Sequence, residues 1–219
     1  MTLHRVTPER LEQEAARWQA RFAPLHGPRT AVILGGNSGP YTLGPKNARE
    51  IARQVEAQAR QRGGSLMIST SARTSPAVID VFEREITVPN VLYRWQPNDR
   101  ENPYFGMLAL CDDLVVTADS ISMLSEACAT GKPVLMAPLG GYGYPMREGQ
   151  DMPVDFRLSA WGYSKMMRWG HPRLSRDLRL VYQQLLEQGR VAWLGEPVVV
   201  STAQSADMAR AVARVRALF

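Results

Sequence analysis

The sequence predicts an α/β fold built on a doubly wound parallel sheet, and three observations support this prediction. Short apolar runs alternate along the chain with longer segments of helical periodicity. The run at residues 30–34 is apolar, as in a buried parallel strand, and leads directly into a glycine-rich loop. Residues 115–136 read as strand, short helix, glycine turn and strand, and so short a helix is a crossover between parallel strands. The architecture expected is Rossmann-like.

Composition fits one domain over residues 1–219. The 45% hydrophobic content is enough for a single core. The 26 basic and 21 acidic residues give a net charge of +5, which suits a phosphate-bearing ligand or an anionic membrane surface. Nucleic acid is not expected, because the basic residues are not interleaved with aromatic ones along one element. No run approaches the roughly 18 apolar residues of a membrane span, so we expect a cytoplasmic protein.

Neither a metal nor a disulfide is expected. Cys111 and Cys128 lie in apolar helical contexts and are predicted to be core residues of a protein kept in a reducing compartment. The three histidines, His4, His26 and His171, share no helical spacing. We therefore expect no metal cofactor.

Start and stop signals mark each element in the first half of the chain. Thr7, Pro8 and Glu9 combine an N-cap, a proline suited to the first turn and an acid favoured by the helix dipole. Gly63 stops the second helix and Ser75 starts the third. The signals predict helices over residues 8–23, 45–62 and 76–84, and strands over residues 30–34, 65–69 and 91–93.

The second half continues the alternation and then becomes irregular. Asn102 opens a helix, and either Asp119 or Ser120 caps the crossover helix that Gly131 ends. The aromatic-rich stretch at residues 138–170 has two interpretations: a helix over residues 155–168 packs on the domain, or the stretch is a partner surface. The other elements expected are strands over 114–117, 134–136 and 191–194 and helices over 103–111, 175–188 (capped by Ser175) and 203–218.

Polar residues follow three of these strands at their carboxyl ends, where open α/β sheets bind ligands. The glycine loop resembles a phosphate cradle without P-loop spacing, and a plain tight turn is the alternative. The next group offers three hydroxyls and a guanidinium to an anion, unless the hydroxyls only cap a helix. The crossover helix offers its N-terminus, although Ser120 could be a simple cap and Glu126 a solvated residue. The candidate ligand-binding residues are Gly35, Gly36, Asn37, Ser38, Thr70, Ser71, Arg73, Thr74, Asp119, Ser120, Ser122 and Glu126.

Four motifs in order, GGNSG, TSART, ENPY and TADSISMLSEACATGKPV, resemble the C-terminal half of the ELM1-like family. That family takes its name from a plant mitochondrial fission protein, and its bacterial members are often called predicted nucleoside-diphosphate-sugar epimerases. It is similar to GT-B glycosyltransferases, which have two Rossmann-like domains facing each other across a cleft. The resemblance is good over residues 28–137, and Ala72 stands where the family usually has a second basic residue.

The resemblance implies a domain that binds a nucleoside-diphosphate sugar without a metal. The glycine loop would meet phosphate or sugar, the Thr70–Thr74 group would add donors, and Asp119, Ser120 and Ser122 would line the helix entry. Glu126 would accept the ribose hydroxyls. The parts of the single domain are an N-terminal helix (1–27), a core (28–137), an irregular aromatic-rich segment (138–174) and C-terminal helices (175–219).

Three functions follow from this reading. The first is the donor half of a glycosyltransferase-like protein, in which the isolated chain binds ligand without turnover because an N-terminal domain or partner chain would supply the acceptor. The second is a non-hydrolysing nucleotide-sugar epimerase, which needs a cleft histidine that none of the four motifs contains. The third is a non-catalytic adaptor in peripheral contact with a membrane, which the basic charge and the aromatic segment would serve.

Overall fold

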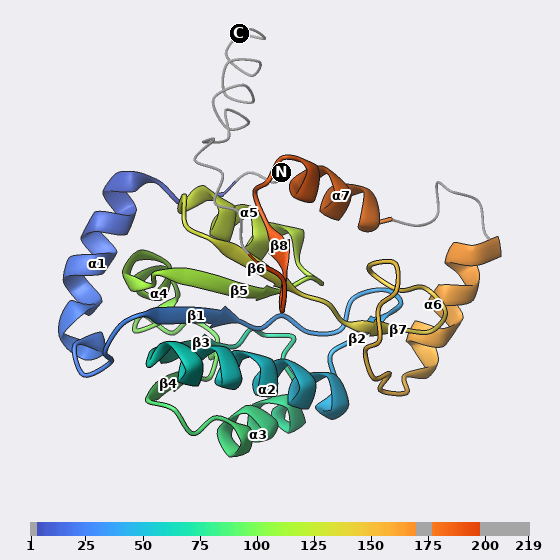
Figure 1. Cartoon of the computed structure of the whole chain (residues 1–219), viewed down its shortest axis with the longest axis horizontal. Helices are drawn as coiled ribbons and strands as arrows, with labels where there is room; N and C mark the ends of the chain where they lie inside the picture. The colour runs from blue at the N-terminus through green and yellow to red at the C-terminus, as the bar shows by residue number, and fades with distance from the viewer. Residues whose placement is uncertain (1–3, 170–176, 198–219) are drawn as a thin grey trace, which may run out of the picture.

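A six-stranded parallel sheet lies at the centre of the chain in the computed structural model, which describes residues 4–169 and 177–197 (Figure 1). Every neighbouring pair of strands is parallel. The predicted doubly wound α/β fold is therefore confirmed. The strands lie in the order β4 (Asn90–Tyr93), β3 (Ser65–Ser69), β1 (Arg29–Ile33), β5 (Asp113–Thr117), β6 (Val134–Ala137) and β8 (Ala192–Trp193).

Helices cover both faces of this sheet, and Figure 1 shows α2 and α3 on one side and α4 and α5 on the other. Helix α2 packs on β1, β3 and α3, whereas α4 packs on β1 and carries α1, and α5 lies on β5 and β6. The described helices are α1 (Pro8–Phe22), α2 (Pro45–Arg62), α3 (Pro76–Glu85), α4 (Tyr104–Leu110), α5 (Ile121–Ala129), α6 (Leu158–Trp169) and α7 (Arg179–Glu187).

The predicted ends of the first four helices are largely confirmed, with two corrections. The Thr7 side chain accepts from Arg10 N at 3.2 Å, and Gly63 ends α2 with a φ of 62°. Ser75 precedes α3 but makes no side-chain cap bond. Asn102 accepts from Tyr104 N at 3.0 Å, and α4 begins only at Tyr104, because Pro103 has a ψ of 7° that is not helical.

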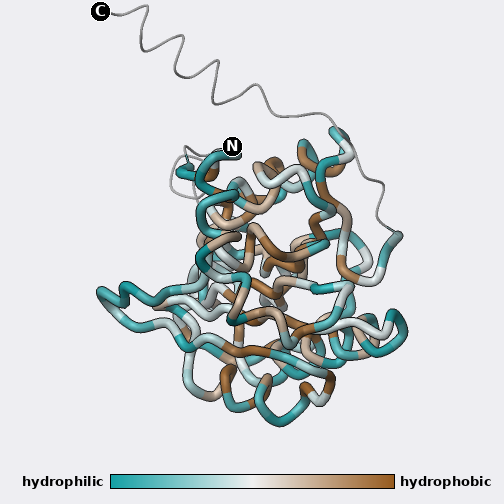
Figure 2. Tube along the Cα trace, turned by 90° about the vertical axis from the view of Figure 1, so that its left-hand side faces the viewer, coloured by the Kyte–Doolittle hydropathy of each residue, from teal (hydrophilic) through white to brown (hydrophobic). Residues whose placement is uncertain are grey.

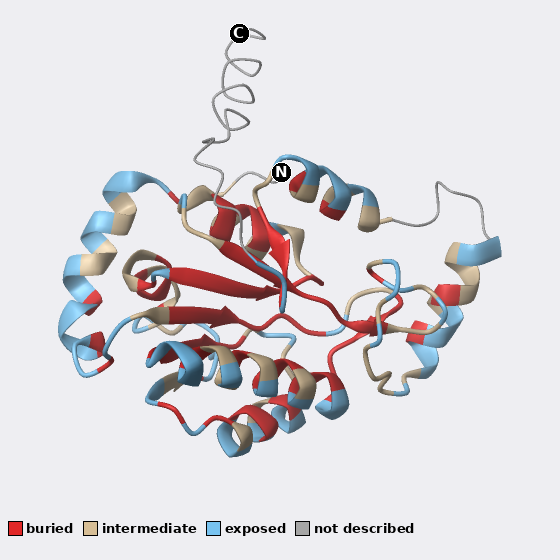
Figure 3. Cartoon of the chain, viewed as in Figure 1, coloured by how far each residue is buried: buried red, intermediate tan, exposed pale blue. Residues whose placement is uncertain are grey.

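The core consists of the strands and the inner faces of the helices. Figure 3 shows the strands as almost wholly buried, and Figure 2 shows the hydrophobic stretches gathered inside the trace with hydrophilic ones around them. Phe22 and Leu34 are wholly buried here. Both cysteines are buried and free, as expected of core residues.

We expect the two thiols to be unreactive in the folded protein. Burial raises the pKa of Cys111 to about 12 and that of Cys128 to about 11, so little thiolate is present near neutral pH. Titration with a chromogenic disulfide at pH 8 should label neither cysteine in native buffer and both in denaturant. Labelling of the native protein as fast as a free thiol would contradict the core assignment.

A second, two-stranded sheet was not predicted. Strands β2 (Tyr41–Thr42) and β7 (Gly140–Gly141) pair antiparallel beyond the carboxyl ends of the main sheet. Two residues a strand are too few for a periodic signal in the sequence. This pairing attaches the segment after β6 to the loop after β1.

The segment between β7 and α6 is fixed by polar side chains. Asn47 is wholly buried in α2; its Oδ1 accepts from Gly140 N at 2.8 Å and its Nδ2 donates to Pro153 O. Asp155 accepts from Lys46 N and Asn47 N, at 3.1 and 3.0 Å, and so caps α2, whose N-cap residue is a glycine without a side chain. The part of the predicted irregular segment that precedes α6 is therefore held by contacts that are distant in sequence.

Helix α6 begins at Leu158, three residues later than predicted, because Asp155 and Arg157 serve other contacts. Arg157 donates to Gly39 O and Tyr41 O at 2.7 and 3.0 Å, and burial lowers its pKa. Ala160 and Ser164 are buried, so one face of the helix packs on the domain, while the opposite face is open.

Several predictions concern residues outside the described ranges. His171, the Ser175 cap and the helix over residues 203–218 are among them. Within residues 4–169 and 177–197, no helix combines the length and apolar character needed to cross a membrane.

Candidate functional site

The direction in which the chain adds strands to the sheet reverses between β4 and β5, so that β1 and β5 lie side by side. The chain runs outward from β1 to β3 and β4, then returns to place β5 on the other side of β1. The loops that leave β1 and β5 therefore diverge to opposite faces, which creates a crevice at the carboxyl end of the sheet.

A cavity of about 390 Å³ lies at this reversal of the strand order, and we call it the switch-point cavity. Its lining includes five of the predicted residues, Ser38, Arg73, Asp119, Ser120 and Ser122, and thus draws on the loops after β1, β3 and β5. The remaining lining residues are Gly39, Pro40, Tyr41, Ile121, Tyr163 and Leu178. Three separate strand ends therefore contribute to a common cavity.

Three amides of the glycine loop are engaged within the protein. Gly35 N donates to Thr117 Oγ1 at 2.8 Å, Gly36 N to Asp119 Oδ2 at 2.9 Å, and Ser38 N to Tyr41 O at 3.1 Å. The Asn37 side chain is also used, since its Oδ1 accepts from Leu43 N at 3.0 Å. A phosphate would have to displace these contacts to use the loop as a cradle.

The two leading glycines are explained by close packing. A Cβ added to Gly35 would lie 2.2 Å from Asp119 Oδ2, and one added to Gly36 would lie 2.2 Å from the backbone oxygen of Arg73. The loop after β1 is thus pressed between the loops after β3 and β5. Glycine is required here for space rather than for a positive φ.

The hydroxyls after β3 connect neighbouring loops. Thr74 Oγ1 donates to Gly35 O at 2.6 Å, Ser71 Oγ donates to the same oxygen at 3.0 Å, and Thr70 Oγ1 accepts from Trp95 N at 2.8 Å. Neither the anion-binding nor the helix-capping interpretation describes these contacts. Their ligand-binding role stays a prediction, because each already serves a structural bond.

Arg73 and Asp119 form the charged centre of the cavity. Their Nη2 and Oδ2 atoms are 2.8 Å apart, and the Asp119 side chain is 0% exposed whereas that of Arg73 is 44% exposed. Arg73 Nη1 also donates to Asn37 O at 3.2 Å. Asp119 Oδ1 has no hydrogen-bond partner among the described residues. The guanidinium consequently remains accessible while its counter-ion is buried.

The buried carboxyl has a definite effect on pH dependence. Burial raises the pKa of Asp119 above its ordinary 3.8, against the lowering effects of Thr117, the Gly36 amide and Arg73. Ionisation therefore costs stability in the folded state, fully so above the folded pKa, and this cost disappears as pH falls below the unfolded value.

We accordingly expect the wild type to gain stability relative to Asp119→Asn as pH is lowered from 7 to 4. Urea unfolding of both proteins at several pH values measures the difference, because the contributions of all other carboxyls cancel in it. A relative loss of wild-type stability over this range would contradict the assignment.

Helix α5 presents its N-terminus to the cavity. Ser120 rather than Asp119 is its cap, with Ser120 Oγ accepting from Met123 N at 3.4 Å, and Ser122 is exposed in the first turn. The first-turn amides of a helix have no intrahelical acceptor and favour an anion. Glu126 does not line the cavity; its Oε2 accepts from the Tyr104 hydroxyl at 2.6 Å on the side facing α4. The geometry therefore does not support its expected ribose contact.

Two tyrosines in the lining were not predicted. Tyr163 of α6 reaches over Gly39, where an added Cβ would lie 3.1 Å from its ring. Tyr41 is 1% exposed, its hydroxyl has no partner among the described residues, and burial raises its pKa. The aromatic content of residues 138–170 was the only sequence signal for Tyr163, and Tyr41 had none.

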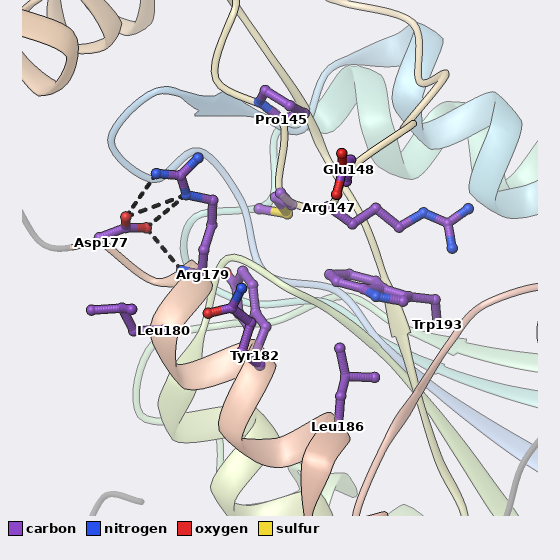
Figure 4. Close-up of a pocket in the computed structure, with 11 residues that line it drawn as sticks. Pro145, Arg147, Glu148, Asp177, Arg179, Leu180, Tyr182, Leu186 and Trp193 are labelled. Atoms are coloured by element: carbon purple, nitrogen blue, oxygen red, sulfur yellow. Dashed lines mark hydrogen bonds and ion pairs between the residues drawn. The ribbon is translucent and has the colours of Figure 1, made fainter.

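A second cavity, of about 610 Å³, lies between residues 145–148, α7 and β8 (Figure 4). Two ion pairs lie at this cavity: Arg179 with Asp177 at 2.8 Å, and Arg147 with Glu196 at 2.6 Å. The guanidinium of Arg179 also stacks on the Tyr144 ring, 3.9 Å from its centroid. The switch-point cavity is the better candidate, because it lies at the carboxyl ends of three parallel strands, where open α/β sheets bind ligands.

No group of three or more metal-ligating side chains that could hold an ion is found among residues 4–169 and 177–197. Asp119, the acidic residue in the described lining of the candidate site, is paired with an arginine. The donor set at the cavity is suited to an anion rather than to a cation.

Comparison with known protein families shows the family of this chain. Residues 1–219 match the family described as mitochondrial fission ELM1. The chain belongs to this family. The resemblance noted from the four motifs is thereby confirmed, and it extends over the parts of the chain that the motifs do not cover.

Three curated relatives place this ELM1-family chain among larger proteins. The mitochondrial fission protein ELM1 of Arabidopsis thaliana is 35% identical over 132 residues, 60% of this chain and 30% of that protein. An uncharacterized protein of Rickettsia prowazekii is 33% identical over 106 residues, 48% of this chain and 30% of its own length. The UDP-N-acetylglucosamine–N-acetylmuramyl-(pentapeptide) pyrophosphoryl-undecaprenol N-acetylglucosamine transferase of Sorangium cellulosum is 27% identical over 124 residues, 55% and 28% of the two chains. The matches span less than a third of each relative.

Two solved structures are also similar to the ELM1-family chain. The UDP-GlcNAc 2-epimerase of Neisseria meningitidis, bound to UDP-GlcNAc, has a TM-score of 0.47 and 14% identity, over 96% of this chain and 51% of that one. A glycosyltransferase of Rickettsia africae has a TM-score of 0.38 and 14% identity, over 82% and 46%.

Proposed function

We propose that this ELM1-family chain binds a nucleoside-diphosphate sugar in the switch-point cavity. The observation that carries the proposal is the meeting of two anion-favouring groups in one cavity: the half-exposed guanidinium of Arg73 and the N-terminus of α5. Ser120 and Ser122 add hydroxyls at the same helix end. A diphosphate is an anion with enough oxygens to meet both groups at once.

In this proposal Asp119 acts as an internal competitor of the ligand. Its carboxylate is paired with Nη2 of Arg73 and accepts a hydrogen bond from the Gly36 amide, and a phosphate would bind the same two groups. Arg73 still has further N–H donors, since a guanidinium carries five. The diphosphate therefore lies on the Arg73 and α5 side of the cavity rather than inside the glycine loop.

The choice of a sugar nucleotide rests on sequence similarity. The Sorangium cellulosum relative is, by its name, a transferase that uses UDP-N-acetylglucosamine. No catalytic residue is assigned, and we expect binding without turnover from this chain alone. An epimerase receives less support, because neither His4 nor His26, the two histidines in the described part of the chain, lines the cavity.

Calorimetry with UDP and UDP-N-acetylglucosamine tests the proposal. Arg73→Met should weaken binding roughly 10- to 100-fold, because a charge-assisted hydrogen bond is lost. Asp119→Asn should tighten it roughly fivefold, because about 1 kcal/mol of competition for Arg73 is removed.

Arg94→Met is the matched control. Arg94 also follows a strand at this edge of the sheet but pairs with Glu83 outside the cavity, so its loss should leave affinity unchanged. The proposal fails if no nucleotide binds the wild type, or if the two arginine variants weaken binding equally.

A further inference from the structure

The outward face of α6 carries large apolar side chains in water. Leu158 is 69% exposed, Trp161 45% and Trp169 71%, and Phe156, just before the helix, is 74% exposed. Among the described residues, only Trp95 and Leu180 are other exposed large apolar side chains. Four of the six such side chains in the described part of the chain thus lie within residues 156–169.

These side chains form a stripe with two basic residues. Leu158, Trp161, Lys165, Arg168 and Trp169 recur at spacings of three and four, so they share one side of the helix. We call these five residues the outer stripe. Ala160 and Ser164 mark the buried side of the helix, which packs on the domain. In most surface helices the large apolar side chains face the core, whereas in α6 the tryptophans face outward.

The charge of the outer stripe is positive without compensation. Residues 156–169 contain no Asp or Glu, and in the described part of the chain neither Lys165 nor Arg168 pairs with a carboxylate. The Lys165 ammonium lies 5.6 Å from the Trp161 ring centroid and 4.5 Å from that of Trp169. The cation is thus held among the aromatic rings themselves.

The position of α6 leaves the outer stripe accessible to a flat surface. Figure 1 shows the helix at the extreme edge of the molecule, with the small β2–β7 sheet between it and the main sheet. Its main contact with another element is to β7, on its inner side. Twelve residues give a helix about 18 Å long, enough to lie along a surface but too short to cross a bilayer.

We propose that the outer stripe docks the protein on anionic lipid bilayers. Tryptophan and leucine enter the interfacial region below the headgroups, where an apolar body and a polar tip are both accommodated. Lys165 and Arg168 reach lipid phosphates with their charged ends while their stems stay on the apolar side. The unpaired positive charges of the outer stripe are complementary to the negative charge that anionic lipids spread over a bilayer surface, and its tryptophans are suited to the interfacial region of that bilayer.

Vesicle flotation of the full chain tests this proposal. The wild type should float with phosphatidylcholine vesicles that contain phosphatidylserine and only weakly with pure phosphatidylcholine. Lys165→Gln combined with Arg168→Gln should reduce binding to the anionic vesicles about fivefold for each residue removed, and leave the weak neutral binding unchanged. Trp161→Ser combined with Trp169→Ser should reduce both by roughly tenfold or more.

Trp95→Ser serves as the control, since Trp95 is 40% exposed but lies after β4, outside the outer stripe. It should float like the wild type, and circular dichroism should show all variants folded. The proposal is overturned if the wild type does not float at low salt, or if Trp95→Ser loses as much binding as the double tryptophan variant. It is also overturned if sedimentation shows that the outer stripe instead joins two copies or captures an acidic protein.

Discussion

Gly36→Ala is expected to destabilise the fold by about 3 kcal/mol, at the upper end of the range for overpacking. The added Cβ would lie 2.2 Å from the backbone oxygen of Arg73 and 2.6 Å from its carbonyl carbon. Backbone atoms cannot turn aside as a flexible side chain can, so the loops after β1 and β3 must separate. Thermal and urea unfolding measure the loss, and the affinity for UDP should fall with it, because Arg73 is displaced.

Gly162→Ala provides the control for a glycine-to-alanine change. Gly162 lies in the middle of α6 with nothing within 4 Å of an added Cβ. The substitution should stabilise the protein by about 0.5–1 kcal/mol through helix propensity alone. If Gly36→Ala were equally harmless, the three loops at the cavity could not be packed as tightly as described.

Asn47→Ala is expected to cost about 2–4 kcal/mol, because it leaves a buried and a partly buried backbone group without partners. The Gly140 amide loses its acceptor and the Pro153 carbonyl loses its donor. These contacts fasten residues 140–157 to α2, so amide exchange at Gly140 should accelerate more than exchange in β1 or β5. Urea unfolding and hydrogen exchange read out the global and the local effect.

Two companion variants sharpen this test. Asn47→Asp keeps the acceptor for Gly140 N but lacks the donor and adds a charge beside Asp155, so it should be no better than alanine. Gln61→Ala changes an exposed residue of the same helix and should stay within about 0.5 kcal/mol of the wild type. An Asn47→Ala protein as stable as Gln61→Ala would mean that the segment is held by other contacts.

The main sheet could be predicted because its signals are local. Apolar strand runs, Thr7 as a cap and Gly63 as a left-handed helix end each act within a few residues, and all were found where expected. The parallel arrangement of the strands then followed from the helical connections between them. The β2–β7 sheet could not be predicted, because its pairing depends on Asn47 and Arg157 contacting residues about a hundred positions away.

The location of the candidate site could be predicted from the sequence, but the contacts of its side chains could not. Its location followed from topology, since polar residues that end neighbouring parallel strands must meet at one edge. The partner of each side chain did not follow. Asp119 has the same local sequence whether it caps a helix or turns to Arg73, and only the approach of the loop after β3 settles this. Glu126 likewise contacts Tyr104, and no local feature of the sequence predicts this contact.

The sequence by itself determined the alternation of strands and helices, the doubly wound order and the edge of the sheet where a ligand would bind, because these depend on periodicity, caps and chain reversal. Only the tertiary structure decided that the glycines serve close packing, that a buried carboxylate holds Arg73, and that α6 turns its tryptophans outward. Such outcomes depend on which segments distant in sequence come together, and that information is not local.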